Sequence, residues 1–174
     1  MKSKMMNILE TDRLILCKLT LDDAPFILEL LNDPAFLRFI GDRGVRTLDD
    51  ARNYIANGPM DSYEKHGFGL YLTKLKDSDT PIGICGLLKR DFLEDADIGF
   101  AFLPEFTGKG YGFESAAAVM EYGKTVLGLK RIVAITAPDN VASIKLLEKL
   151  GLRFEKTARF SKDGSESKLF VPDV

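Results

Sequence analysis

The chain has 174 residues, of which 45% are hydrophobic and 29% charged, so it can bury a substantial core, and its length suits one domain, residues 1–174. Its 24 basic and 26 acidic residues give a formal net charge of −2 with no basic block, which argues against a nucleic-acid partner. One histidine and two cysteines are too few for a histidine-based triad or a zinc cluster, so we expect no metal site. No apolar run approaches the ~20 residues of a membrane span, and no apolar segment of a signal peptide follows the charged start. We therefore expect a cytoplasmic protein without a membrane partner.

Seven segments have the composition and alternation of β-strands. Two of them, 68–73 and 81–88, are separated by a polar turn at 76–80, and we expect them to pair as a hairpin. Another, 131–136, is apolar throughout, as is typical of a strand that is covered on both faces. The predicted strands are 10–19, 68–73, 81–88, 95–103, 131–136, 152–160 and 167–171.

The strand at 95–103 alternates between large apolar side chains and small or polar ones. Because successive side chains of a strand point to opposite faces, the two sets should lie on opposite sides of the sheet. The first set is Ile98, Phe100 and Phe102, and the second is Asp97, Gly99 and Ala101.

Four segments have helical periodicity and helix boundary signals. Asn32-Asp33-Pro34 is expected to end the first helix, and Asn57-Gly58-Pro59 the second, with one further helical turn left open for 60–67. In the third helix we expect the apolar stripe to run through Phe113, Ala116, Ala117, Met120 and Leu127. The predicted helices are 25–31, 47–55, 113–127 and 141–150.

A glycine-rich loop lies between the strand at 95–103 and the third helix, with glycines at 108, 110 and 112. Glycines let the backbone approach a ligand closely, and the free N–H groups at a helix N-terminus favour an anion such as a phosphate. The dinucleotide fingerprint fails because the third glycine would fall at Phe113 or Ser115. The P-loop pattern fails because Gly110, rather than Ser or Thr, follows Lys109. A turn that binds no ligand is the alternative.

Thr107-x-x-Gly110-x-Gly112 matches the Q/R-x-x-G-x-G/A loop of the GNAT acetyltransferases. Segments 10–14, 97–112 and 140–152 resemble, in order and spacing, the branch of this family that acetylates the N-termini of ribosomal proteins. The resemblance extends from about residue 10 to residue 160. It implies an α/β fold with a mixed, splayed central sheet of about seven strands, flanked by about four helices, with coenzyme A in the cleft.

The resemblance also implies acetyl-CoA as the cosubstrate and residues that bind it. Asn140 would contact the pantetheine arm, and Lys149 could reach the phosphate end, although a plain helix cap and an exposed lysine are the respective alternatives. Lys109 could add a positive charge or be an ordinary loop lysine. The full set implied by the resemblance is Phe102, Leu103, Gly108, Lys109, Gly110, Tyr111, Gly112, Asn140 and Lys149.

Acetyl transfer to an amine needs a base, an oxyanion donor and a tolerable leaving thiolate. By resemblance, Asp97 is the candidate base, directly or through water, and a backbone N–H near Phe102 is the oxyanion donor; a surface aspartate is the alternative for Asp97. Ser143 could donate to the thiolate or be a capping-box partner. Two positions depart from the family: Thr107 replaces Gln or Arg, and Leu147 stands where many members carry a tyrosine acid.

The acceptor amine is left open by the sequence. An α-amine is easier to deprotonate than a lysine by about 3 kcal/mol, so a marginal base favours a protein N-terminus or a small molecule that attacks directly in a ternary complex. Two alternatives remain: a non-catalytic coenzyme A-binding module, and an acetyltransferase that modifies antibiotics or polyamines.

Overall fold

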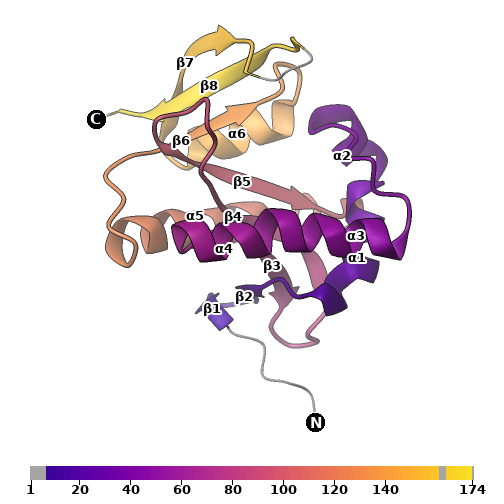
Figure 1. Cartoon of the computed structure of the whole chain (residues 1–174). Helices are drawn as coiled ribbons and strands as arrows, with labels where there is room; N and C mark the ends of the chain where they lie inside the picture. Colours follow the sequence, from indigo (N-terminus) through magenta and orange to yellow (C-terminus); the bar gives the residue numbers. More distant parts are fainter. Residues whose placement is uncertain (1–6, 161–163, 174) are drawn as a thin grey trace.

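The computed structural model describes residues 7–160 and 164–173, and its centre is one sheet with strand order β1-β2-β3-β4-β5-β6-β8-β7 (Figure 1). Neighbouring strands are antiparallel except β5 and β6, which are parallel. The strands are β1 Asn7–Glu10, β2 Leu14–Lys18, β3 Leu70–Leu75, β4 Pro81–Leu88, β5 Ala96–Phe102, β6 Ile132–Thr136, β7 Leu152–Ala158 and β8 Ser167–Pro172. This mixed α/β sheet confirms the predicted fold class.

Helices cover both faces of the sheet. On one face, α5 packs its Ala116 and Val119 against strand residues such as Leu16, Cys85 and Ile98. On the other face, α1 and α3 bury a second cluster that includes strand residues of β3 and β4. The helices are α1 Ala24–Leu31, α2 Pro34–Phe39, α3 Leu48–Ile55, α4 Asp61–His66, α5 Tyr111–Thr125 and α6 Val141–Lys149.

The first predicted strand, 10–19, is in fact the second strand of a hairpin. β1 and β2 pair in antiparallel fashion around a turn in which the Thr11 N–H donates to the Leu14 carbonyl at 2.9 Å. The Leu14 N–H also donates to Thr11 Oγ1 at 3.0 Å. These two bonds close a turn at residues 11–13. β1 therefore ends at Glu10 and β2 begins at Leu14, so the predicted strand 10–19 is divided by the turn.

Of two predicted helix stops that contain proline, one was right and one was wrong. α1 ends at Leu31 with Asn32 as its C-cap, as predicted, but a further helix, α2, which was not predicted, begins directly after it. Asp33 caps α2, accepting a hydrogen bond from the Ala35 N–H at 3.0 Å, and Pro34 occupies the first helical turn, where its missing N–H is not needed. Asn57-Gly58-Pro59 does not end α3, because the segment Ala56–Met60 forms a wider π-helical stretch that carries the chain into α4. Figure 1 shows α3 and α4 as one continuous rod. The helical turn left open at 60–67 is thus α4.

The buried stripe of α5 differs in part from the prediction. Ala116 and Met120 are buried as expected, whereas Phe113 and Ala117 lie at the edge of the stripe and are only half-buried. The centre of the stripe is formed instead by small residues that let the helix lie close to the sheet: a Cβ added at Gly123 would come within 2.7 Å of Ile132. The buried residues of α5 are Ser115, Ala116, Val119, Met120 and Gly123.

Candidate active site

The sheet splays between β5 and β6. The two strands pair only at Ala96↔Ile132 and Asp97↔Val133, and beyond these positions they diverge. The Leu103 N–H donates to the Ile82 carbonyl at 3.0 Å, which fixes the phase of the β4–β5 ladder. The alternation of an antiparallel ladder then turns the backbone polar groups of Phe100 and Phe102 away from β4, toward the gap. The Leu103 N–H is engaged, so it offers no donor to a ligand.

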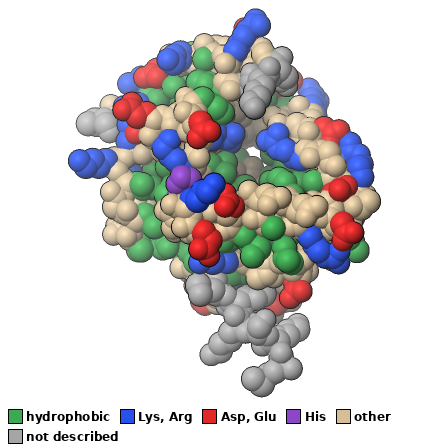
Figure 2. Space-filling view, viewed as in Figure 1, with side chains coloured by type: hydrophobic (Ala, Val, Ile, Leu, Met, Phe, Trp, Pro, Cys, Tyr) green, Lys and Arg blue, Asp and Glu red, His purple; other side chains and the backbone are tan. Residues whose placement is uncertain are grey.

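A cavity of about 980 Å³ lies at this gap. Its wall includes β5 residues from Ile98 to Ala101, the end of β6, and Asn140, Ser143 and Leu147 of α6 and its cap. The opposite part of the wall comes from α2, the loop that follows it, α4 and the connection between β4 and β5. Figure 2 shows a hollow on this face with Lys and Arg side chains around it. The cavity thus borders the splayed strands on one side and α2, α4 and the β4–β5 connection on the other.

Asp97 lies beside this cavity but beneath the surface of its wall. Its side chain is 1% exposed, and Arg90, which does line the cavity, brings its Nε to 3.2 Å from each carboxylate oxygen. Burial raises the pKa of the Asp97 carboxyl, and the opposing attraction of Arg90 leaves it at about 6. Asp97 is therefore not a surface residue, and it can exchange a proton near neutral pH. Sequence analysis missed Arg90, which follows a strand end without any motif.

Ser143 and Asn140 meet at the start of α6. Asn140 caps the helix, since its Oδ1 accepts from the Ser143 N–H at 3.2 Å. The Ser143 hydroxyl is not a capping-box partner: it accepts a hydrogen bond from Thr136 Oγ1 at 3.0 Å. That bond leaves the Ser143 proton available for donation into the cavity. Leu147, only 1% exposed, lines the same wall and supplies no acid.

The glycine-rich loop delivers the N-terminus of α5. Gly108 and Gly110 have φ values of 75° and 86°, a left-handed conformation that favours glycine. Gly110 is the N-cap and provides no side-chain cap, and the first intrahelical bond runs from the Glu114 N–H to the Gly110 carbonyl at 3.0 Å. Helix geometry leaves the N–H groups of Tyr111, Gly112 and Phe113 without an intrahelical acceptor. These donors and the helix dipole suit a phosphate.

Two side chains near the loop are turned to other partners. Thr107 Oγ1 donates to the Pro104 carbonyl at 2.7 Å, so it presents no donor in place of the family's Gln or Arg. Lys149 Nζ lies 4.4 Å from the centroid of the Phe113 ring, which joins α6 to the first turn of α5. A Cβ at Gly112 would come within 3.3 Å of Leu146, so this glycine also permits close helix packing.

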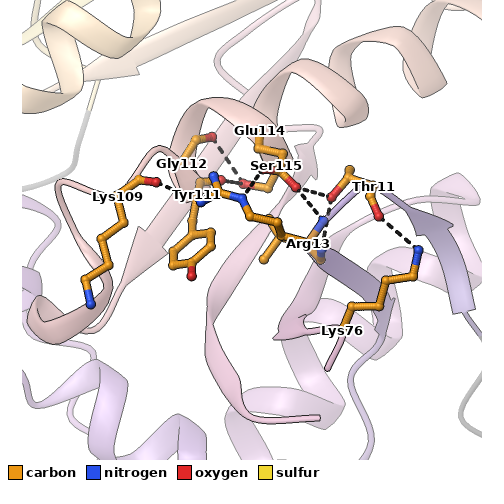
Figure 3. Close-up of polar contacts among 9 residues, drawn as sticks. Thr11, Arg13, Lys76, Lys109, Tyr111, Gly112, Glu114 and Ser115 are labelled. Carbon is orange, nitrogen blue, oxygen red and sulfur yellow. Dashed lines mark hydrogen bonds and ion pairs between the residues drawn. The ribbon is translucent and has the colours of Figure 1, made fainter. Parts of the chain in front are cut away.

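Arg13 and Glu114 hold the loop from the β2 side, a contact that sequence analysis missed (Figure 3). Arg13 Nε lies 2.7 Å from Glu114 Oε1, its Nη1 donates to the Lys109 carbonyl at 3.1 Å, and its guanidinium stacks 4.3 Å above the Tyr111 ring. Burial would raise the pKa of the Glu114 carboxyl, but the hydrogen bonds from Thr11 and Arg13 outweigh it and lower that pKa. We call Arg13 and Glu114 the loop clamp.

In the described part of the chain, no group of three or more His, Cys, Asp or Glu side chains could hold a metal ion. Burial raises the pKa of Cys17 to about 11 and that of Cys85 to about 12, so neither is a reactive thiolate near neutral pH. None of the described helices is long and apolar enough to span a bilayer.

Comparisons with known proteins agree with this geometry. A sequence model of the acetyltransferase (GNAT) domain matches residues 13–153. The Bacillus subtilis (strain 168) protein named "Uncharacterized N-acetyltransferase YoaA" is 33% identical over 157 residues, which cover 89% of this chain and 88% of the relative. The YnaD N-acetyltransferase of the same strain is 31% identical over 145 residues, covering 83% and 82% of the two chains.

Solved structures share the fold at lower identity. An acetyltransferase from Agrobacterium tumefaciens str. C58 superposes with a TM-score of 0.81 at 20% identity, covering 100% of this chain and 98% of that one. RimL, a ribosomal α-N-protein acetyltransferase, in complex with coenzyme A superposes with a TM-score of 0.80 at 17% identity, covering 95% and 96%. The fold and the relatives together define the class as an α/β N-acetyltransferase. The chain belongs to the GNAT acetyltransferase family, whose members use acetyl-CoA, and it transfers an acetyl group to an amine.

Proposed function

We propose that this chain acts as one GNAT domain of the Rim-type branch, and that its acceptor is the α-amine of a protein N-terminus or a small-molecule amine, attacked directly in a ternary complex. The observation that carries the proposal is the splay of β5 from β6, which leaves the backbone of Phe100 facing a cavity of about 980 Å³ and that of Phe102 facing the gap beside it. An unpaired strand edge can bind the amide-rich pantetheine arm as a neighbouring strand would.

The coenzyme's phosphates are assigned to the glycine-rich loop. Backbone N–H groups from Gly108 to Gly112, with those of the first turn of α5, supply the donors, and each hydrogen bond to a charged group contributes roughly 1.5–3 kcal/mol. Asn140 lies at the cavity wall, where its side chain can serve both as helix cap and as a contact for the pantetheine arm. Lys109 and Lys149 add positive charge near the phosphate end.

Asp97 accepts the proton of the attacking amine through a water, because the carboxylate is buried beneath Arg90 and does not itself line the cavity. The amine nitrogen forms a bond to the acetyl carbon while the carbon–sulfur bond breaks. The Phe102 N–H faces the gap and donates to the acetyl oxygen as negative charge develops there. The Ser143 hydroxyl donates to the departing thiolate, and that help is modest because a thiol of pKa ~8.5 leaves readily.

A panel of amines read out by mass spectrometry tests this function. The purified chain is incubated with acetyl-CoA and peptides with free α-amines, Nα-blocked peptides with internal lysines, small amines, aminoglycosides and polyamines. Acetylation of α-amines or small amines, with release of one coenzyme A per product, supports the proposal. Binding of acetyl-CoA without consumption in any reaction would indicate the non-catalytic module instead. Preferred acetylation of aminoglycosides or polyamines would indicate the antibiotic- or polyamine-modifying alternative.

A further inference from the structure

The wall of the cavity carries charged side chains, and its carboxylates are already paired with basic residues. Each carboxylate on that wall has an arginine or lysine within ion-pair distance, so the protein itself satisfies this negative charge. The pairs are Asp42–Arg46 at 2.5 Å, Asp61–Lys65 at 3.1 Å, Asp139–Arg38 at 3.5 Å and Glu166–Arg159 at 3.6 Å.

Two guanidinium groups on the same wall keep hydrogen-bond donors available. Arg43 has no ion pair or hydrogen bond to any residue of 7–160 or 164–173. Arg90 uses only its Nε to hold Asp97, and within those same ranges its two terminal nitrogens have no acceptor. A guanidinium can only donate, and Arg43 is exposed and Arg90 part-exposed, so these nitrogens are free to donate to an acceptor on a ligand in the cavity.

Tyr54 of α3 adds a third donor to this wall. It lines the cavity with Arg43 and Arg90, and burial raises the pKa of its phenol while both arginines act in the opposite direction. All three side chains line one cavity, so a single ligand in it can meet them. The phenol is protonated at neutral pH, so it too can donate a hydrogen bond.

We propose that Arg43, Arg90 and Tyr54 bind a carboxylate of the acceptor, which makes the acceptor a carboxylate-bearing primary amine. This inference rests on the proposed function, because it assigns the acceptor of that same site. Hydrogen bonds between guanidinium and carboxylate are roughly twice as strong as neutral ones, whereas a polycation would meet like charge at this wall. Arg90 also touches Asp97, so the carboxylate site adjoins the proposed base, as an amine and a carboxylate on one small molecule require.

The test compares matched acceptors that differ in one carboxylate. Free α-amino acids are compared with their amides, peptides beginning with Asp or Glu with those beginning with Asn or Gln, and spermidine represents polycations. Because the amides have the more acidic ammonium, kcat/KM is expressed per neutral amine. We expect the carboxylate to raise this value by about 10-fold or more. Whichever of the two comparisons shows the larger increase in kcat/KM indicates whether the carboxylate belongs to a free amino acid or to an acidic N-terminal residue.

Variants then locate the effect. Arg43→Met should lower kcat/KM by about 10-fold for carboxylate-bearing amines and by less than about 2-fold for the amides, and Tyr54→Phe should show the same selectivity with a smaller loss. The matched control is Arg153→Met, an exposed arginine of β7 paired with Asp173 at 3.1 Å, which should change neither value. Equal losses for both kinds of amine, or a preference for amides, would overturn the inference alone, whereas a preference for spermidine would overturn the proposed function as well. If no amine in the panel is acetylated although acetyl-CoA binds, the proposed function fails and the inference with it.

Discussion

Asp97 combines two properties that a base for amine acetylation needs: closeness to the cavity and a pKa that burial raises to about 6. A base acts in its ionised form, so kcat/KM of the wild type should fall as the pH drops through about 6 and be insensitive to this group above it. Arg90 holds the carboxylate by both oxygens and so keeps its pKa from rising further.

Asp97→Asn should lower kcat by about 100-fold or more near pH 7, with the loss shrinking at high pH, where solvent deprotonates the amine. The KM for acetyl-CoA should hardly change. The control is Asp95→Asn, a neighbouring carboxylate that pairs with Arg131 at 3.5 Å and does not line the cavity. Parallel pH–rate profiles with equal plateaus for Asp97→Asn and the wild type would remove the base role from this residue.

The same raised pKa has a consequence for stability. The folded carboxyl retains its proton between its ordinary pKa of 3.8 and about 6, whereas the unfolded one does not. The contribution of Asp97 to the free energy of unfolding therefore decreases as the pH rises through this window. Urea titrations of the wild type and of Asp97→Asn at several pH values measure it by difference. A difference that grows in favour of the wild type as the pH rises would contradict this sign.

Ser143 is expected to assist departure of the thiolate without being essential. Ser143→Ala should slow transfer by less than about 100-fold, because a thiolate leaves readily and general acid catalysis typically contributes 10²–10⁴-fold. Steady-state kinetics on the folded variant checks this. Complete loss of turnover would mean that the Thr136–Ser143 pair supplies the acid that Leu147 cannot.

Among the elements, the loop clamp decides how α5 presents its N-terminus. Glu114 lies four residues after Gly110, so without Arg13 its carboxylate would repel the phosphates that the loop is proposed to bind. The ion pair joins β2 to the first turn of α5 and is partly exposed, with side chains 46% and 20% accessible. Exposed pairs typically contribute 0–1 kcal/mol to stability, so the clamp should matter more for binding than for folding.

A double-mutant cycle on the loop clamp tests this reasoning. Arg13→Gln should raise the KM for acetyl-CoA by about 10-fold and leave the KM for the amine unchanged, and Glu114→Gln should have a much smaller effect. The double variant should recover part of the loss, because the uncompensated carboxylate is gone. If it is as impaired as Arg13→Gln, Arg13 acts by holding the Lys109 carbonyl rather than by neutralising Glu114.

At the scale of the whole molecule, the sequence was sufficient to predict those features of the fold whose signal lies in neighbouring residues. Alternation in 95–103 predicted the sides of β5, and the glycine spacing predicted the turn that begins α5. Pro34 was correctly predicted to follow the end of α1, but its place at the start of α2 was missed. Pro59 was wrongly predicted to end a helix, because it lies within a π-helical stretch that continues into α4. Of the segment between the predicted strands 152–160 and 167–171, residues 161–163 lie outside the described part of the chain.

Only those residues of the site that belong to a sequence motif could be predicted. Arg13 and Glu114 are 101 positions apart in the chain, and Arg90 reaches Asp97 across the connection between β4 and β5. No spacing rule links such residues, because only the pairing of the strands brings them together. The burial of Asp97, which sets its pKa, likewise depends on side chains from several elements.

Binding of acetyl-CoA should stabilise the whole fold, because the ligand would bridge two parts of the sheet that pair at only two positions. A ligand present at 100 times its Kd adds about 2.7 kcal/mol, which raises the Tm of a domain of this size by about 5–10 °C. Differential scanning fluorimetry measures the shift. Lys109→Glu should reduce the shift strongly, because it places a carboxylate at the phosphate loop. The substitution leaves Gly110, whose left-handed backbone favours glycine, unchanged. An equal shift in the wild type and in this variant would place the phosphates elsewhere.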